Sequence, residues 1–262
     1  MNTLKEKYGS YALITGASSG IGEEFAIRLA REGMNLILVA RRKERLENLK
    51  SELESKNKIE VVVVPLDLAQ DNFLDVIKEF IGNKEIGLLI NNAGFGFRGE
   101  FFEADPDHYS KMIKLNCTAP TLLTHYILPQ MIQRKKGAMI FLGSLVAFQP
   151  TPMTATYAAT KVFNAFLSDA LWYELRKYNI DVLSLNPGGT KTEFQSVANS
   201  STGPFQRTSE QVVDTAMKAL GKKPSVVDGV YNKILAVASR FISRKLTIIC
   251  TGKISESLYK KS

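Results

Sequence analysis

The feature that most constrains the fold is a glycine-rich turn set between an apolar run and an amphipathic segment. Residues 11–15 (YALIT) are typical of a short buried strand, and residues 23–32 keep apolar side chains at a helical period. The turn between them, residues 16–22, reads GASSGIG. Such a turn lets backbone N–H groups at a helix N-terminus approach a phosphate closely. We therefore expect a dinucleotide phosphate site here. A plain glycine-rich turn is the alternative, since the spacing departs from G-x-G-x-x-G.

The second apolar run, residues 35–40 (NLILVA), is followed directly by Arg41 and Arg42. In a dinucleotide-binding fold this strand end meets the adenosine ribose. An acid there accepts from the 2′-hydroxyl of NAD, whereas an arginine accommodates the 2′-phosphate of NADP. No acid stands at this turn, which favours NADP(H), with Ser19 as a second contact. The alternative is that both arginines begin a solvated basic helix.

Strand-like and helix-like segments alternate along most of the chain. Further strands are expected at residues 59–66, 87–90, 138–142 and 180–185, and helices at residues 44–53, 73–81, 106–136 and 155–177. Six alternations predict an α/β fold: a single Rossmann-type, doubly wound parallel sheet with helices on both faces. Residues that follow the strands then share the carboxyl edge of the sheet, where such folds bind ligands.

Polar residues follow several of these strands. Asp67 stands just past a strand end, where it either meets an adenine or caps the next helix. Residues 91–94 (NNAG) predict a turn whose small residues admit a flat ligand and whose amides satisfy nearby backbone. Asn116 lies among apolar residues of a long helical segment. If buried, it belongs either to a structural hydrogen-bond network or to a proton path.

The stretch 143–161 carries three groups suited to proton transfer: the hydroxyl of Ser144, the phenol of Tyr157 and the ammonium of Lys161. Tyr157 and Lys161 are four apart, so they share one face of a helix. A free phenol titrates near pH ~10, and a neighbouring ammonium favours the phenolate. We therefore expect Lys161 to lower the pKa of Tyr157 and make it a general acid/base. Ser144 would donate to the same substrate oxygen, although this spacing also occurs by chance on exposed helices.

Taken together, these motifs resemble the short-chain dehydrogenase/reductase family over roughly residues 8–225. The resemblance implies a catalytic set in which Tyr157 is the acid/base and Lys161 holds the nicotinamide ribose. In the same set Ser144 orients the substrate carbonyl, and Asn116 supports a water relay to Lys161. The resemblance rests on the shared order and spacing of residues 15–22 (TGASSGIG), Asp67-Leu68, residues 91–94 (NNAG), Asn116, Ser144, residues 157–161 (YAATK) and Pro187-Gly188.

The same resemblance implies NADP(H) as the cofactor. Arg41 would meet the 2′-phosphate, Asp67 the adenine, and Asn92 the adenosine ribose region, while Thr190 and Thr192 would contact the carboxamide. The expected cofactor-binding residues are Gly16, Ser18, Ser19, Gly20, Ile21, Gly22, Arg41, Arg42, Asp67, Leu68, Asn92, Ala93, Gly94, Tyr157, Lys161, Pro187, Gly188, Thr190 and Thr192.

Within the family, the chain looks most like the bacterial 7β-hydroxysteroid dehydrogenases and the long-chain 3-oxoacyl reductases, on the basis of residues 6–9 (EKYG), Gly33-Met34 and Gly221-Lys222. It departs from the family in two places. Gly143 stands where many members have a serine. Residues 228–232 (DGVYN) and a basic tail replace the usual last strand, which leaves the usual tetramer open.

Composition excludes several other classes of function. The chain has 262 residues, 45% hydrophobic and 23% charged, with two cysteines. We expect no disulfide framework, no secretory signal and no membrane span, and hence a cytoplasmic protein. His108 and His125 lack partners at metal-ligand spacing, so no metal is expected. The net charge of +8 is concentrated in residues 229–262, which argues against a broad nucleic-acid face.

We expect residues 1–228 to form the dinucleotide-binding and catalytic domain and residues 229–262 to be its basic amphipathic C-terminal extension. The extension either packs on the body or on a second subunit, or makes a peripheral contact with an anionic membrane. A homodimer or homotetramer is expected. Residues 192–207 are polar and predict either a lid or a plain surface loop.

The predicted function is NADPH-dependent reduction of a ketone to a secondary alcohol, or the reverse, on a small hydrophobic substrate such as a steroid or an acyl chain. Pocket walls are expected at residues 95–103, 146–154 and 192–207, of which the second is largely apolar. The alternative is a catalytically silent NADP(H)-binding regulatory or scaffold protein. The intact Asn116, Ser144, Tyr157 and Lys161 speak against it.

Overall fold

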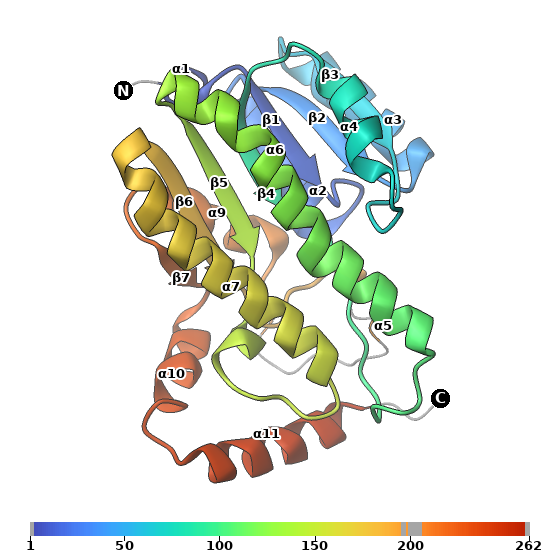
Figure 1. The fold of residues 1–262 in the computed structure, drawn as a ribbon, viewed down its shortest axis with the longest axis vertical. Helices are drawn as coiled ribbons and strands as arrows, with labels where there is room; N and C mark the ends of the chain where they lie inside the picture. Colours follow the sequence, from blue (N-terminus) through green and yellow to red (C-terminus); the bar gives the residue numbers. More distant parts are fainter. Residues whose placement is uncertain (1–2, 195–197, 199–205, 260–262) are drawn as a thin grey trace.

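The computed structural model describes residues 3–194, 198 and 206–259. Its centre is a seven-stranded parallel sheet in the order β3-β2-β1-β4-β5-β6-β7 (Figure 1). The strand order reverses between β1 and β4, which is the switch point at which doubly wound sheets open a ligand crevice. The strands are β1 Tyr11–Thr15, β2 Asn35–Ala40, β3 Val61–Pro65, β4 Ile86–Asn91, β5 Gly137–Leu142, β6 Ile180–Asn186 and β7 Ser225–Val227.

Helices cover both faces of the sheet. Side chains of β1 alternate between two cores: Ala12 and Ile14 pack with Phe25, and Leu13 packs on the other face with Ile77 and Leu123. Burial on both faces explains why the strands are nearly continuous apolar runs. The predicted doubly wound α/β fold is confirmed. The helices are α2 (Gly20–Arg31), α3 (Lys43–Lys56) and α9 (Ser209–Ala219) on one face, and α4 (Phe73–Ile81), α6 (Ala119–Arg134) and α7 (Ala155–Leu175) on the other.

The long helical segment expected at residues 106–136 is divided in the structure. It consists of α5 (Pro106–Ile113), a π-helical segment (Lys114–Thr118) and α6. Asn116 lies in the π-helical segment. Such segments change the direction in which a side chain points and occur frequently at functional sites.

The C-terminal edge of the sheet corrects one expectation. The family's last strand is present as β7, which pairs with β6 through Leu185 and Val226, and residues 228–232 follow it rather than replace it. With three residues, of which only Val226 is buried, β7 was too short for its pattern to predict a strand. The sheet thus ends just before Asp228, and the division at residues 228/229 stays a prediction.

Two helices follow the sheet: α10 (Val230–Ala238) and α11 (Arg244–Leu258). The second lies across the loops at the carboxyl edge, far from the short N-terminal helix α1 (Leu4–Tyr8) (Figure 1). The hydroxyl of Thr251 donates to the carbonyl of Pro150 (2.9 Å) and so fastens α11 to one of these loops. In the described part of the chain, no helix is long and apolar enough to cross a membrane.

Candidate active site

The turn after β1 has the shape of a phosphate cradle. Gly16 and Gly20 have φ angles of +68° and +63°, in the left-handed region that favours glycine. A Cβ on Gly22 would collide with the carbonyl oxygen of Gly16, and one on Gly20 would lie 2.9 Å from the Thr192 methyl group. Helix α2 begins at Gly20 and directs its N-terminus at this turn. These residues therefore fit the pyrophosphate of a dinucleotide.

The two arginines after β2 differ in position. Both are exposed, but the guanidinium of Arg42 donates to the hydroxyls of Ser18 (3.1 Å) and Ser19 (2.7 Å), whereas the Arg41 side chain makes no hydrogen bond to a described residue. Ser19 makes no capping bond to its own helix, so its hydroxyl is turned toward Arg42. A guanidinium beside two hydroxyls at the end of β2 fits a 2′-phosphate. Arg42, rather than Arg41, is the arginine that lies over the turn.

An acidic residue outside the glycine turn also contacts the guanidinium of Arg42. Glu193, from the loop after β6, pairs with Arg42 (2.7 Å) and with Arg45 (2.7 Å). Sequence analysis missed Glu193 and Arg45, because they meet across a gap of 148 residues that no local pattern records. Through these ion pairs, the loop after β6 is joined to Arg42 beside the glycine turn.

Asn92 bridges β1 and β4 where the two strands diverge. Its amide donates to the carbonyl of Thr15 (2.8 Å), and its backbone N–H donates to the Thr15 hydroxyl (2.9 Å). The amide therefore satisfies strand-end backbone, as predicted. Thr15, which the sequence analysis did not single out, organises the turn, since Ala93 donates to the same hydroxyl (3.0 Å).

The residues expected around the adenine lie beside the switch point. Leu68 and Ala93 line a small cavity together with Leu115. Asp67 accepts from the backbone N–H of Ala69 (3.0 Å), so its carboxylate caps a local turn. Its contact with an adenine stays a prediction.

Asn116 is fully buried and joins three segments of the chain. Its amide donates to the carbonyl of Phe95 (2.9 Å) and to the hydroxyl of Thr160 (3.0 Å). Its own backbone carbonyl accepts from the amide of Asn164 (2.8 Å), a buried residue that sequence analysis missed. A Cβ on Gly94 would lie 3.0 Å from Oδ1 of Asn116 and 3.6 Å from Nζ of Lys161, so both groups lie beside Gly94. The structural network is established, and the water relay stays a prediction.

Tyr157 is protonated at neutral pH. Burial raises its pKa to about 12, while the hydrogen bond with Ser144 and the positive charge of Arg98 oppose that rise. Ser144 ends the loop after β5, where its hydroxyl also accepts from the backbone of Val146 (3.3 Å). The phenol and the hydroxyl thus meet at the carboxyl edge of the sheet, as predicted.

Lys161 corrects the predicted electrostatics. It is 5% exposed and donates to the carbonyl of Leu142 (2.8 Å), with Nζ 5.7 Å from the ring centroid of Tyr157. Burial lowers its pKa to about 8. The expectation that Lys161 lowers the pKa of Tyr157 is wrong in this structure, because burial of the phenol outweighs the opposing groups, which are Ser144 and Arg98.

The segment after β6 reaches the same edge. The carbonyl of Pro187 accepts from the backbone beside Ser144 (2.9 Å), and the hydroxyl of Thr190 donates to the carbonyl of Gly188 (3.2 Å). These residues therefore lie close to the catalytic set, while contacts with a carboxamide stay a prediction. Most of the predicted lid, residues 195–197 and 199–205, lies outside the described residues.

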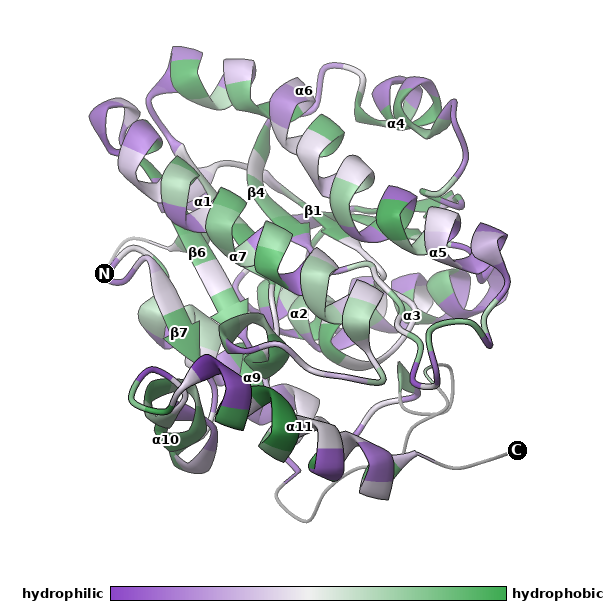
Figure 2. Cartoon of the chain, turned by 60° about the horizontal axis from the view of Figure 1, so that its bottom comes forward, coloured by the Kyte–Doolittle hydropathy of each residue, from purple (hydrophilic) through white to green (hydrophobic). Residues whose placement is uncertain are grey.

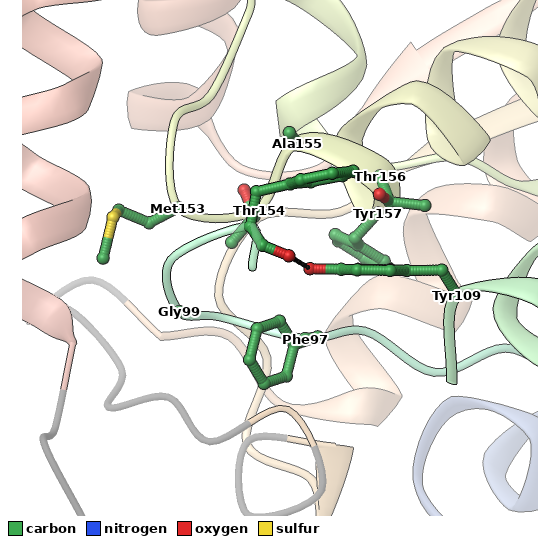
Figure 3. Close-up of a pocket in the computed structure, with 9 residues that line it drawn as sticks. Phe97, Gly99, Tyr109, Met153, Thr154, Ala155, Thr156 and Tyr157 are labelled. Carbon is green, nitrogen blue, oxygen red and sulfur yellow. Dashed lines mark hydrogen bonds between the residues drawn. The ribbon is translucent and has the colours of Figure 1, made fainter. Parts of the chain in front are cut away.

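A mainly apolar cavity opens beside the phenol of Tyr157 (Figure 3). Two of the predicted walls, residues 95–103 and 146–154, contribute to it. Tyr109 of α5 was missed by sequence analysis; its ring stacks on Phe101 at 5.0 Å between centroids, and its hydroxyl donates to the Phe101 carbonyl (2.7 Å). The lining residues are Phe97, Gly99, Phe101, Tyr109, Met153, Thr154, Ala155, Thr156 and Tyr157.

Hydride transfer to a carbonyl needs a dinucleotide placed beside a proton donor, and this sheet edge offers a cradle for the first and Tyr157 for the second. The molecule is therefore a dinucleotide-dependent oxidoreductase. The chain belongs to the short-chain dehydrogenase family, whose model matches residues 10–203.

Two similar proteins are identical to this chain at about a third of the aligned residues. Hydroxysteroid dehydrogenase-like protein 1 of Gallus gallus is 33% identical over 223 residues, which cover 83% of this chain and 67% of the relative. Very-long-chain 3-oxoacyl-CoA reductase of Homo sapiens is 33% identical over 217 residues, covering 81% and 69%. The chain thus spans about two thirds of the length of these two relatives.

Solved structures show the same architecture. A 7β-hydroxysteroid dehydrogenase superposes with a TM-score of 0.89 at 26% identity, covering 95% of this chain and 99% of the other. A short-chain dehydrogenase from Sphingobium yanoikuyae in complex with NADPH gives a TM-score of 0.80 at 34% identity, covering 88% and 93%. Together with the basic site at the end of β2, these findings make the chain an NADP(H)-dependent oxidoreductase that acts on ketone or alcohol groups, as the sequence predicted.

Proposed function

We propose that this enzyme uses NADPH to reduce a bulky, apolar ketone, such as a steroid or a long acyl chain, to a secondary alcohol. The observation that carries the proposal is the cavity beside Tyr157, whose walls include Phe97, Phe101 and Met153. Apolar walls favour a substrate that leaves water, and the aromatic side chains offer broad flat surfaces to a ring system. A solved structure named as a 7β-hydroxysteroid dehydrogenase and a relative named as a very-long-chain 3-oxoacyl-CoA reductase support this substrate class.

The chain's own groups account for the proton in this reaction. The glycine turn and Arg42 would hold NADPH, which would supply the hydride for the carbonyl carbon when bound. Tyr157 donates its phenolic proton to the carbonyl oxygen, and a pKa of about 12 keeps that proton in place at neutral pH. The hydroxyl of Ser144 donates a second hydrogen bond, so two donors stabilise the charge that develops on oxygen. In this proposal, buried Lys161 holds the nicotinamide ribose and returns a proton to Tyr157.

The direct test is NADPH oxidation by the purified enzyme over a panel of ketones of increasing bulk. Steroid ketones and long-chain oxo esters should be reduced with a kcat/KM at least about tenfold above that for acetone or cyclohexanone. A preference for small polar ketones would contradict the proposal. Activity on no ketone would favour the alternative of a silent NADP(H)-binding protein, for which the site geometry offers no support.

We also propose that a second copy of the chain packs on α7. This helix exposes Phe163, Phe166 and Tyr173, with 42%, 68% and 74% of their surface open to solvent, beside Ile113 of α5. A cluster of this kind suits a symmetric dimer in which the same patch faces itself. Light scattering should report a dimer or tetramer, and Phe166→Glu should shift it toward the monomer. A monomeric wild type would reject this interface.

For the C-terminal helices we propose a peripheral contact with an anionic membrane. Helix α11 buries the small polar residues Thr247, Thr251 and Ser255, whereas its large apolar side chains are exposed. Hydrophobic and hydrophilic residues both occur along its ribbon (Figure 2). Cations flank this face at Arg240, Arg244, Lys245 and Lys253, which complements anionic headgroups. The exposed apolar side chains, 46% to 84% open to solvent, are Val230, Ile234, Val237, Phe241, Leu246, Ile249 and Ile254.

Co-sedimentation with phosphatidylserine vesicles tests this contact. The wild type should pellet with these vesicles more than with uncharged ones, and Phe241→Glu should abolish the difference. Phe80→Glu on α4 is the control, because it adds the same charge far from the patch. If Phe241→Glu pellets with phosphatidylserine vesicles as much as the wild type does, the membrane role is rejected. The exposed apolar face would then be assigned to contact with a second subunit. We place the enzyme in the cytoplasm, which cell fractionation tests.

A further inference from the structure

Arg98 is a cation near Tyr157 that has no acidic partner among the residues that the structure describes. Its Nε atom is buried and makes no hydrogen bond. Its Nη1 atom donates only to a backbone carbonyl, that of Ser255 in α11 (3.3 Å). In the described chain Arg98 forms no ion pair, whereas Arg28, Arg42, Arg45, Arg134 and Arg207 each pair with a carboxylate.

The loop that carries Arg98 borders the substrate cavity, although Arg98 itself is not one of the residues that line it. Phe97 and Gly99, on either side of it in the chain, both line the cavity beside Tyr157. A Cβ on Gly96 would lie 3.0 Å from the ring of Tyr157, so this loop packs directly on the catalytic side chain. The guanidinium is also close enough to Tyr157 to lower its pKa.

The backbone around Arg98 is held firmly. Its N–H donates to the carbonyl of Ala198 (3.0 Å), and the N–H of Gly99 donates to the carbonyl of Met153 (2.9 Å). The bond to Ser255 then orients the guanidinium from the side of α11. The site is thus preorganised, which reduces the entropy lost when a ligand binds.

An unpaired guanidinium that is half withdrawn from water costs free energy, and burial accordingly lowers the pKa of Arg98. The acid nearest in the chain, Glu100, is exposed, and Glu103 accepts from the backbone of Glu100 (2.9 Å) and from the hydroxyl of Tyr259 (2.7 Å). Neither forms an ion pair with Arg98. A negative charge delivered by a ligand would therefore offset this cost.

We propose that Arg98 binds a carboxylate carried by the substrate, so that the enzyme prefers an apolar ketone that is also an acid. This inference rests on the proposed ketone reduction and adds one polar contact to an otherwise apolar site. Nε, which is free of protein partners, supplies a donor for a carboxylate oxygen, and a bond from a guanidinium to a carboxylate is among the stronger hydrogen bonds in proteins.

The test compares each acid with its own methyl ester. Two pairs are used: a steroid ketone with a side-chain carboxylate, and a long-chain oxo fatty acid. The Kd with which each acid or ester binds to the enzyme–NADPH complex is measured by quenching of NADPH fluorescence. The kcat/KM for each compound is measured by NADPH oxidation. The variants are Arg98→Leu, Arg98→Lys and, as the control, Lys111→Leu, which removes an exposed cation from α5. Thermal melting of each variant confirms that it folds.

The wild type should bind each acid roughly 10- to 100-fold more tightly than its ester, as expected for a charge-assisted hydrogen bond. Arg98→Leu should bring this ratio to about 1, Arg98→Lys should restore part of it, and Lys111→Leu should leave it unchanged. A change in the pKa of Tyr157 would alter the reduction of an acid and of its ester to the same extent. Such a change therefore cancels in the ratio of acid to ester.

Equal Kd values for acid and ester in the wild type would overturn the inference, as would an acid preference that survives in Arg98→Leu. If the acids bind preferentially through Arg98 but no ketone is reduced, the proposed reaction fails while the carboxylate site stands. Binding and turnover therefore report on the two claims separately.

Discussion

The ammonium of Lys161 lies 2.8 Å from the carbonyl oxygen of Leu142, the last residue of β5. The catalytic lysine is therefore fastened to the sheet itself rather than only to its own helix, α7. It is 5% exposed, and burial lowers its pKa to about 8. Removing a charged lysine from water destabilises the folded state, and the backbone carbonyl compensates only in part.

This burial predicts how stability depends on pH. Because the pKa of Lys161 falls from 10.5 to about 8 on folding, the unfolded chain binds more protons between these values, and stability rises with pH across that window. From about pH 7 to about pH 10 the free energy of unfolding of the wild type should gain on the order of 2 kcal/mol relative to Lys161→Met. Urea denaturation of both proteins at a series of pH values measures this difference. If the free energies of unfolding of the two proteins change with pH in the same way, the buried-lysine account is wrong.

Cofactor preference should depend on Arg42 more than on Arg41, since only Arg42 contacts Ser18 and Ser19. Arg42→Ala should lower kcat/KM for NADPH by about 10- to 100-fold, the loss expected for a hydrogen bond to a charged group, and leave NADH nearly unchanged. Arg41→Ala is the matched control and should change either value less than about threefold. Steady-state kinetics with both cofactors decides, and the reverse order of effects would refute the assignment.

Gly143 is explained by the residue that faces it. A Cβ at this position would collide with the amide oxygen of Asn186, at the end of β6. Gly143→Ser should therefore lower the free energy of unfolding by about 1–3 kcal/mol, the usual cost of overpacking. In an Asn186→Ala background the same change should cost much less, which a double-mutant cycle measures. Equal costs in both backgrounds would show that Asn186 is not the reason for glycine here.

The fold was predictable because its determinants are local. Strands buried on both faces are apolar runs. The spacing of the glycines in the turn after residue 15 is enough to predict a phosphate-binding turn. Strand β7 escaped prediction because three residues, one of them buried, make no pattern.

The sequence predicted that Ser144, Tyr157 and Lys161 lie together, but not the electrostatics of these groups. Spacing placed Tyr157 beside Lys161, yet the pKa of the phenol is governed by burial, Ser144 and Arg98, and burial depends on the tertiary structure. The contacts of Glu193 with Arg42 and of Arg98 with Ser255 join residues 151 and 157 apart in the chain. No local pattern reveals such pairs, so these contacts of Arg42 and Arg98 could be found only in the structure.

The most direct test of the account is the kinetics of Tyr157→Phe with a bulky ketone that the wild type reduces. The variant lacks only the phenolic oxygen, so kcat should fall by about 10²- to 10⁴-fold, the usual share of general acid catalysis. The Kd for NADPH, followed by cofactor fluorescence, should stay within about threefold of the wild type. Turnover near the wild-type rate, with NADPH still bound, would show that Tyr157 is not the proton donor.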